Sequence, residues 1–211
     1  MRRKIQILYE DEYLLIVNKP PHILVQPPPL KTTLTDIINR ECKKDSKPDF
    51  LPCHRLDKET SGAIIYAKTK ECASRIMQMF KQRKIKKTYI GFVQGVLSPP
   101  RGRISFSLYG KKASTSYKVL KQCKDFCIVE IKPLTGRKNQ IRLHFKRMGH
   151  PLVGESKFSF RREFPLKFKR VCLHAWKLEF NHPFLRKMIK IQVGLWPDLR
   201  NFLRKYLLKR D

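Results

Sequence analysis

The sequence predicts an α+β fold in which a long mixed or antiparallel sheet is flanked by helices. Two observations carry this prediction. Short apolar segments bounded by Gly, Pro and charged turns recur along the chain, most densely between residues 86 and 133, and such segments are typical of strands. Four further segments have apolar residues at helical spacing. The 211 residues show neither an internal repeat nor a linker, so we expect one domain over residues 1–211.

The first third of the chain alternates between strands and helices. "KIQILYEDEYLLIVNKP" reads as two short strands around an acidic turn, and the Pro-rich "PPHILVQPPPL" reads as an extended loop, because a residue before Pro disfavours helix. "TTLTDIINRECKK" predicts a helix with a Thr cap. "GAIIYAKT" predicts a buried strand. "KECASRIMQMFKQRK" predicts an amphipathic helix with an apolar stripe through Ala73, Ile76, Met77 and Phe80.

The remaining chain is dominated by strands. Six segments are expected to be strands: "KKTYIGFVQG", "GRISFSLYG", "STSYKVLKQ", "DFCIVEIKP", "CLHAWKLEF" and "RKMIKIQVGL". Between the fourth and fifth of them, "GRKNQIRLHFKRMG" predicts a helix with an apolar stripe through Ile141, Phe145 and Met148, and with Arg142 on another side. "PDLRNFLRKYLLKR" predicts a basic amphipathic helix at the end.

The charge balance indicates a polyanionic partner. Against 47 Lys and Arg there are 17 Asp and Glu, so 30 cations stay unpaired even if every acid finds a partner. Basic residues run along the whole chain, mixed with Phe, Tyr and Pro, which favours nucleic acid over a membrane surface. No apolar run approaches 18 residues and no targeting segment is evident, so we expect a cytoplasmic protein that spans no membrane. The scattered cysteines predict free thiols and no metal site.

The stretch "HRLDKETSG", residues 54–62, holds the best candidate for chemistry. The chain has no Gly-rich phosphate loop and no zinc-protease or serine-hydrolase motif, which leaves carboxylates and cations as the candidate reactive groups. In an extended segment Arg55 and Asp57 project to the same side, so the guanidinium favours an ionised carboxylate. Such a carboxylate suits a nucleophile that meets RNA. Taken alone, however, the stretch is better explained as a solvated ion-pair cluster of Arg55, Asp57 and Lys58, because surface pairs are common.

Six motifs in order resemble the RluA-type pseudouridine synthases. The catalytic motif of that family, HRLDxxTSGxxxxAK, is matched at every fixed position by residues 54–68. The other five segments that resemble family motifs are "NKPPHILVQP" (18–27), "KTY" (87–89), "LTGRKNQIRLH" (134–144), "GHPLVGE" (149–155) and "LHAWKLEFNHP" (173–183). Together they run through most of the chain, and this extent favours the catalytic interpretation over the ion-pair loop.

The resemblance implies an RNA uridine isomerase without a cofactor. It implies a pseudouridine synthase fold with a central RNA-binding cleft, acting on ribosomal RNA, transfer RNA or both. Some relatives carry an amino-terminal S4 domain, and the position of the first motif leads us to expect none here. RNA is the one partner expected, and the protein is expected to be a monomer. A noncatalytic RNA-binding protein and a glycosylase that releases the base are the competing classes.

The same resemblance assigns roles to individual residues. Asp57 is the essential carboxylate, Tyr89 stacks on the target base, and Arg142 pairs with Asp57 to hold it ionised. Four residues are expected to bind RNA: Arg55, Leu56, Arg137 and Ile141. Arg55 fills the gap left by the flipped uridine, or else makes a second ion pair with Asp57. The active-site turn is shaped by His54, Thr60, Ser61 and Gly62.

Four positions depart from the family pattern. Asn139 and Gln26 stand where His is usual, Ile23 where Gly is common, and Glu155 where Asp is usual. None of them replaces Asp57, Tyr89 or Arg142, so they bear on RNA positioning and loop shape. Two basic stretches, 81–87 and 161–170, are candidate RNA clamps or ordinary solvated loops.

Overall fold

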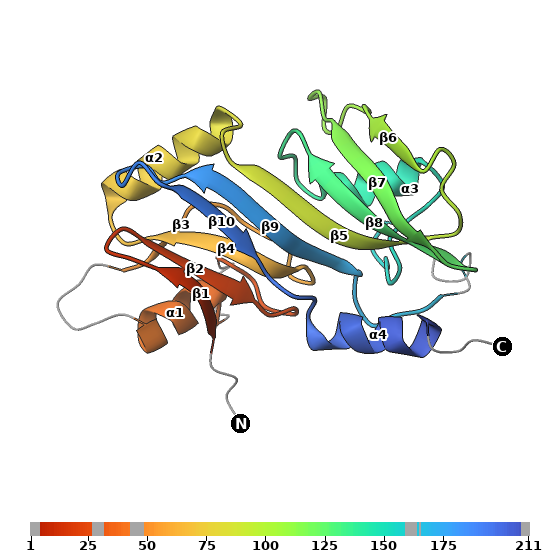
Figure 1. The fold of residues 1–211 in the computed structure, drawn as a ribbon, viewed down its shortest axis with the longest axis horizontal. Coiled ribbons are helices and arrows are strands. Elements are labelled where there is room, and N and C mark those ends of the chain that lie inside the picture. Colours follow the sequence, from red (N-terminus) through yellow and green to blue (C-terminus); the bar gives the residue numbers. More distant parts are fainter. Residues whose placement is uncertain (1–4, 27–31, 43–48, 159–163, 165, 208–211) are drawn as a thin grey trace. The chain divides into compact units, whose positions relative to one another are not determined.

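A computed structural model describes residues 5–26, 32–42, 49–158, 164 and 166–207. Within them lie ten strands, assigned to a sheet, and four helices, so the predicted α+β class is confirmed (Figure 1). The strands are β1 (Gln6–Glu10), β2 (Leu14–Lys19), β3 (Leu51–Pro52), β4 (Ser61–Ala67), β5 (Lys86–Gln94), β6 (Arg101–Ile104), β7 (Thr115–Gln122), β8 (Phe126–Pro133), β9 (Leu173–Asn181) and β10 (Met188–Gln192). The helices are α1 (Leu34–Cys42), α2 (Lys70–Lys81), α3 (Gln140–Arg147) and α4 (Pro197–Leu207).

The chain forms two compact units, each built from two chain segments. Unit 1 comprises Met1–Lys86 and Ala175–Gly194, and unit 2 comprises Lys87–His174 and Leu195–Asp211. Both units contain strands and helices. The single domain predicted for residues 1–211 stays a prediction.

Unit 1 is built around two fully buried strands. β2 pairs antiparallel with β1 on one side and with β4 on the other, and every residue of β2 and β4 is buried. Alternate residues serve opposite faces. Ile16 and Ile65 share a core cluster with Ile76 of α2. Tyr66 points the other way, and its hydroxyl lies 3.2 Å from the Thr35 hydroxyl of α1. Coverage on both faces explains why these strands are continuous apolar runs.

The helices of unit 1 begin where capping residues predict. The Thr33 hydroxyl accepts from the Asp36 N–H at 3.3 Å, and the Asp36 carboxylate accepts from the Thr33 N–H at 2.8 Å, so α1 starts with a reciprocal cap. Thr69 caps α2 by accepting from the Cys72 N–H at 3.1 Å. The expected apolar stripe of α2 is wrong at Met77, which is 44% exposed, because the buried face is centred on Ile76 and the next residue is turned by about 100° from it.

Unit 2 places a helix and an aromatic cluster against antiparallel strands. β8 pairs with β5 and β7, and β7 also pairs with β6. Phe145 of α3 packs edge-on against Tyr117 of β7, with ring centroids 5.8 Å apart. Phe202 of α4 lies 5.5 Å from Phe92 of β5, ring centre to ring centre. These contacts give unit 2 a core of its own.

Two predicted segments differ from the structure, and two others lie partly outside the described residues. The strand expected over "GRISFSLYG" ends at Ile104, and the residues after it form a tight hairpin turn. The helix expected over "GRKNQIRLHFKRMG" is shorter and begins at Gln140, because Asn139 adopts a left-handed backbone, φ 53°, that ends helical geometry toward the N-terminus. The Pro-rich segment at 27–30 and residues 161–163 and 165 of the second basic stretch lie outside the described residues.

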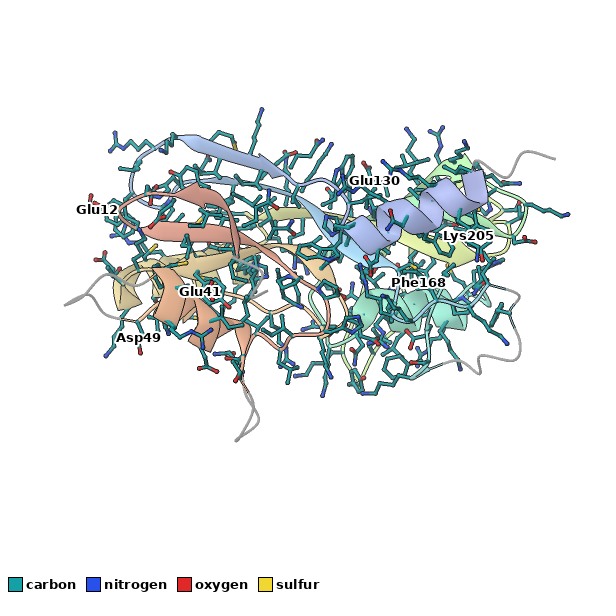
Figure 2. All side chains as sticks on the ribbon, turned by 90° about the horizontal axis from the view of Figure 1, so that it is seen from below. Glu12, Glu41, Asp49, Glu130, Phe168 and Lys205 are labelled. Carbon is teal, nitrogen blue, oxygen red and sulfur yellow. The ribbon has the colours of Figure 1, made fainter. Side chains whose placement is uncertain are left out.

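Figure 2 shows how the charge is distributed on the folded chain. Blue-tipped side chains of Lys and Arg project from both units, and acids such as Glu12, Glu41 and Glu130 are sparse among them. Within the described residues, the excess of cations over acids thus extends over the surface of both units.

Candidate active site

The turn that carries Asp57 lies between β3 and β4 in unit 1. The Thr60 N–H donates to the Asp57 carbonyl at 3.0 Å and closes a four-residue turn. Asp57 itself is half-buried, while Arg55 and Lys58 are exposed. The backbone around the carboxylate is therefore fixed, and the neighbouring cations face solvent.

A buried lysine joins this turn to the loop after β2. The Lys19 side chain is fully buried, and its ammonium donates to the carbonyls of Pro20, Ile23 and Lys58 at 2.9, 2.9 and 3.1 Å. The Lys58 carbonyl belongs to the residue next to Asp57. Sequence reasoning did not single out Lys19, although the "NKP" segment placed it in a matched motif. Ile23 stands where the family commonly has Gly. Because Lys19 binds the Ile23 backbone carbonyl, this hydrogen bond does not depend on which side chain is present.

Two other residues of the stretch are turned into unit 1. The Ile65 N–H donates to His54 Nε2 at 3.1 Å, so this ring nitrogen carries a lone pair, and the ring lies 4.8 Å from that of Phe80. His54 thereby ties the turn to β4. Leu56, expected among the RNA-binding residues, is buried, which leaves little of its side chain for RNA.

At the end of the stretch 54–62, the backbone of Gly62 lies close against the backbone of Ala175. Thr60 and Ser61 are buried, and Gly62 has φ +117°, a conformation that side chains disfavour. A Cβ on Gly62 would lie 2.3 Å from the Ala175 carbonyl oxygen of β9. Only glycine fits there, because the obstacle is backbone and cannot rotate away.

Replacing Gly62 by Ala is expected to lower the free energy of unfolding by about 3 kcal/mol, from steric overlap with Ala175 and from the left-handed backbone. Urea denaturation measures the loss. Gly194→Ala is the matched control in the same unit, since a Cβ there would meet no atom of the described residues within 4 Å, and it should change stability little. Equal effects of the two substitutions would contradict the close approach.

Tyr89 and Lys87 lie two residues apart on β5 of unit 2 and so point to the same face of that strand. Tyr89 is buried and pairs with Ile131 of β8. Burial lowers the pKa of Lys87 below its ordinary value. Its Nζ lies 3.8 Å from the position a Cβ on Gly136 would take, so this lysine reaches the loop before α3.

Arg142 of α3 forms a buried, two-pronged ion pair with Glu155. Arg142 Nε and Nη2 each donate to one carboxylate oxygen at 2.7 Å, and the two side chains are 7% and 1% exposed. Phe158 lies over the guanidinium, 5.0 Å from its ring centre. The side of α3 expected to be polar thus holds a buried cation at Arg142. One signal in the chain pointed to its partner, since Glu155 is the acid that ends a matched motif.

The loop before α3 is held by the Gln140 side chain. Its Oε1 accepts from the Thr135 hydroxyl at 2.6 Å and from the Arg137 N–H at 3.0 Å. Its Nε2 donates to the Ser114 carbonyl and the Thr115 hydroxyl, both at 2.9 Å. Arg137 is exposed and lies outside the helix, three residues before Gln140, rather than at its first turn. Ile141, next to this hub, is buried.

The Glu155 carboxyl makes stability depend on acid pH. Burial by itself raises the pKa of Glu155, but the hydrogen bonds and charge of Arg142, together with hydrogen bonds from the backbone N–H groups of Lys157 and Phe158, outweigh burial and lower it below the ordinary value of 4.5. The unfolded carboxyl therefore takes up a proton before the folded one does. The contribution of the pair is complete above about pH 4.5 and is lost as pH falls toward the folded pKa.

The stability gap between the wild type and Glu155→Gln is therefore expected to be widest at neutral pH and to narrow between about pH 5 and 3. Urea midpoints measured across this range test the expectation. Glu41→Gln, which alters the exposed pair with Arg40, is the control and should leave a small gap at every pH. A gap that stays constant on acidification would count against the pair as the source.

The predicted catalytic residues are divided between the two units. Asp57 and its turn belong to unit 1, whereas Tyr89, Ile141 and Arg142 belong to unit 2. Within unit 2 the structure places Arg142 with Glu155. The expected ion pair between Arg142 and Asp57 joins one unit to the other and stays a prediction.

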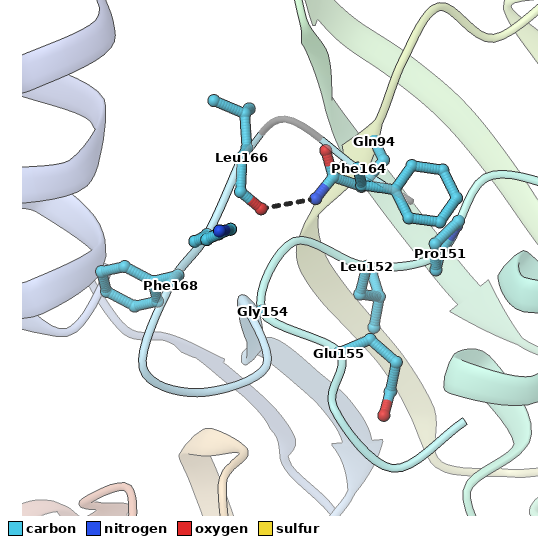
Figure 3. Close-up of a pocket in the computed structure, with 9 residues that line it drawn as sticks. Gln94, Pro151, Leu152, Gly154, Glu155, Phe164, Leu166 and Phe168 are labelled. Atoms are coloured by element: carbon cyan, nitrogen blue, oxygen red, sulfur yellow. Dashed lines mark hydrogen bonds between the residues drawn. The ribbon is translucent and has the colours of Figure 1, made fainter. Parts of the chain in front are cut away.

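Figure 3 shows a small cavity of unit 2 that borders Glu155. Gln94 Nε2 donates to the Leu166 carbonyl at 2.7 Å across it, and Pro151, Leu152 and Phe168 help to line it. Its volume is about 20 Å³, which suits a single water molecule and excludes a nucleotide. Among the described residues no cluster of His, Cys, Asp or Glu could hold a metal ion.

No helix in the described part of the chain combines the length and the apolar character needed to cross a membrane.

Comparisons with known proteins converge on one family. A sequence profile described as RNA pseudouridylate synthase matches residues 13–147. The tRNA pseudouridine synthase C of Vibrio parahaemolyticus is 30% identical over 233 residues, covering 93% of this chain and 94% of its own. The dual-specificity RNA pseudouridine synthase RluA of Escherichia coli strain K12 is 34% identical over 193 residues, covering 84% of this chain and 87% of its own.

Solved structures agree in fold. Human RNA Pseudouridylate Synthase Domain Containing 4 superposes with a TM-score of 0.81 at 25% identity, covering 96% of this chain and 93% of its own. The human protein named Domain Containing 1 of the same series gives 0.76 at 26% identity, with 93% and 86% covered.

Proposed function

The chain belongs to the RNA pseudouridylate synthase family, and from this membership we propose that Asp57 supplies the carboxylate of its active site. The protein is an isomerase that converts uridine to pseudouridine in ribosomal RNA, transfer RNA or both. One observation carries the residue assignment: the family match over 13–147 contains Asp57, Tyr89 and Arg142, each at its motif position.

A single carboxylate is sufficient for the isomerisation. Asp57 attacks the target uridine or assists removal of its base from the sugar, and the base then rotates and rejoins the sugar through ring carbon 5. Because no water is consumed, the second carboxylate that a hydrolytic glycosidase uses to activate water has no task here. The half-buried position of Asp57 suits this role, since the carboxylate is partly shielded from water and yet reachable by RNA.

The Arg142–Glu155 pair supports the proposed partnership with Asp57. Glu155 takes the edge of the guanidinium formed by Nε and Nη2. An arginine has a second edge, formed by its two Nη atoms, on which a second carboxylate is bound in the same plane. Glu155 therefore fixes the orientation of the Arg142 guanidinium. The proposal assigns the second edge, formed by the two Nη atoms, to the Asp57 carboxylate. Glu155 is then a positioning residue.

The roles of Arg55 and of the surface cations are supported by exposure and charge, whereas those of Tyr89 and Ile141 rest on their motif positions alone. Arg55 is exposed, as a side chain that fills the gap left by a flipped uridine must be before RNA arrives. Tyr89 is assigned to stacking on the target base, with buried Ile141 beneath the base. The cations over the surface supply phosphate contacts that hold the RNA. We also propose that the protein is a monomer and that it acts in the cytoplasm.

A tritium-release assay on RNA labelled at uracil carbon 5 tests the reaction class. A pseudouridine synthase releases tritium to water without free uracil, because carbon 5 exchanges its hydrogen for the bond to the sugar. A glycosylase gives labelled free uracil, and a noncatalytic RNA-binding protein gives neither product. Sequencing pseudouridines in cellular RNA with and without the gene then identifies the target.

A further inference from the structure

A hairpin in unit 2 holds an aromatic side chain in an unfavourable backbone conformation. Residues 105–114 join β6 to β7 (Figure 1), and we call the first eight of them hairpin 105–112. Leu108 and Lys111 exchange backbone hydrogen bonds of 2.9 and 3.0 Å around Tyr109 and Gly110. Both central residues have positive φ, 52° and 71°, which defines a tight type I′ turn. Asn and Gly are the residues that such turns favour at these positions.

Tyr109 is not placed at the turn by demands of the fold. Its side chain is 65% exposed, so it contributes little to the core, and its left-handed backbone is an outlier for a bulky residue. A Cβ on the neighbouring Gly110 would meet no atom of the described residues within 4 Å, so the tip is open. A strained and solvent-facing aromatic residue is typical of a binding site rather than of a structural turn.

A second aromatic ring on the hairpin, that of Phe106, is supported by contacts from α3. Phe106 is 41% exposed. Buried His144 of α3 lies with Nε2 3.1 Å from the Phe106 carbonyl oxygen, and its ring meets the Phe106 ring edge-on at 6.4 Å. Arg147 Nη1 donates to the Ser107 carbonyl at 2.8 Å, and its guanidinium lies 5.9 Å from the Phe106 ring centre. The hairpin is therefore a rigid support for its exposed rings.

Cations are frequent around the two rings, and the surrounding sequence lacks acids. The segment from residue 96 to residue 124 contains no Asp or Glu. Arg137 Nε donates to the Lys112 carbonyl at 3.2 Å, which holds one more exposed cation against the hairpin. The exposed cations on or beside it include Arg101, Arg103, Lys111, Lys112, Arg137 and Arg147.

We propose that hairpin 105–112 is a stacking platform for unpaired nucleotides of the RNA substrate. Bases stack on Tyr109 and Phe106, and the flanking cations bind the phosphates between them. Exposed rings interleaved with cations are the pattern by which proteins hold single-stranded nucleic acid. A protein partner would require a broader apolar surface than two rings among serines and cations. The inference rests on the proposed function for its ligand, and it adds a binding site separate from the residues assigned to catalysis.

The test compares a 12-residue oligouridine with an abasic 12-mer that has the same phosphates, using fluorescence anisotropy. The wild type should prefer the oligouridine, because only it has bases to stack. Tyr109→Leu should weaken oligouridine binding by about tenfold and leave abasic binding within about twofold, since stacking on one ring is lost and charge is kept. Tyr109→Phe keeps the ring and should bind as the wild type does.

Leu120→Ala is the matched control, because Leu120 is a 47% exposed apolar residue on β7 of the same unit. It should bind both oligomers normally. The proposal is overturned if the wild type binds the two oligomers equally, if Tyr109→Leu binds oligouridine as the wild type does, or if the substitution weakens both oligomers alike.

Turnover separates this inference from the proposed function. In single-turnover tritium release on a transcribed RNA substrate, Tyr109→Leu should raise the half-saturating enzyme concentration about tenfold and leave the rate constant at saturation unchanged. A wild type that binds oligouridine preferentially but releases no tritium refutes the proposed function and leaves the platform standing. A wild type that isomerises uridine while Tyr109→Leu binds normally refutes the platform alone.

Tyr109→Gly tests the backbone strain, because it should raise thermal stability while it weakens RNA binding. Glycine adopts the left-handed backbone without strain, so the substitution should raise the melting temperature by a few degrees while it weakens oligouridine binding. A lower melting temperature would contradict the strained turn on which the inference depends.

Discussion

Replacing Asp57 by Asn is expected to reduce pseudouridine formation by at least about a thousandfold while RNA binding and folding persist. Asparagine has nearly the shape of aspartate but lacks a nucleophilic carboxylate. The turn around it is closed by the Asp57 carbonyl and the Thr60 N–H, both of them backbone groups that the substitution keeps. Tritium release measures the loss, and anisotropy with labelled RNA measures the binding that remains.

Asp49→Asn is the control for this experiment, because Asp49 is an exposed acid of the same unit that no motif includes. It should turn over normally. Asp57→Glu restores the charge but moves the carboxylate outward by one methylene, so we expect it to bind RNA and to remain severely impaired. Full turnover by Asp57→Asn would show that another group performs the reaction.

Replacing Arg142 by Met is expected to lower the free energy of unfolding by about 3–5 kcal/mol. The loss comes from Glu155, whose side chain is 1% exposed and would be left as a buried carboxylate without its cation. Exchanging both partners for apolar residues of similar size removes the charge as well as the pair. The double variant Arg142→Met with Glu155→Met should therefore recover most of the lost stability, as measured by urea denaturation.

The double variant separates structure from catalysis. If Arg142 also orients Asp57, the double variant should be folded and yet isomerise uridine at a small fraction of the wild-type rate. Arg40→Met is the control for the substitution itself, because Arg40 forms an exposed pair with Glu41 at 3.5 Å and should matter little. A stable double variant with normal turnover would remove Arg142 from the catalytic proposal.

Much of the fold could be predicted from local patterns. β2 and β4 are continuous apolar runs of the kind that both faces of a buried strand require, and Thr33 and Thr69 cap the helices that follow them. The α+β class followed from such segments taken together. The errors lie where an apolar pattern is ambiguous, as at Met77, or where a backbone torsion ends an element early, as at Asn139.

The candidate site was predictable as a set of motifs but not as a set of contacts. Asp57, Tyr89 and Arg142 were named from the motifs in which they stand. The contacts of Lys19 with Lys58 and of Arg142 with Glu155 could not be predicted, although these residues stand in or beside motifs, because each contact joins two different segments of the chain. Periodicity within one segment contains no information about such pairings.

The order in which the chain is made bears on how unit 1 acquires its core. Leu14 and Ile65 of its first segment share their core cluster with Phe180, Ile189 and Val193. At a translation rate of roughly 5–20 residues per second, the ribosome needs about 5–20 seconds to proceed from the end of that segment to the residues that cover it. During this interval the apolar face of β2 and β4 is not yet covered by these three residues, while the strands of unit 2 leave the ribosome. Nascent unit 1 should therefore be a preferred client of ribosome-associated chaperones until β10 is complete.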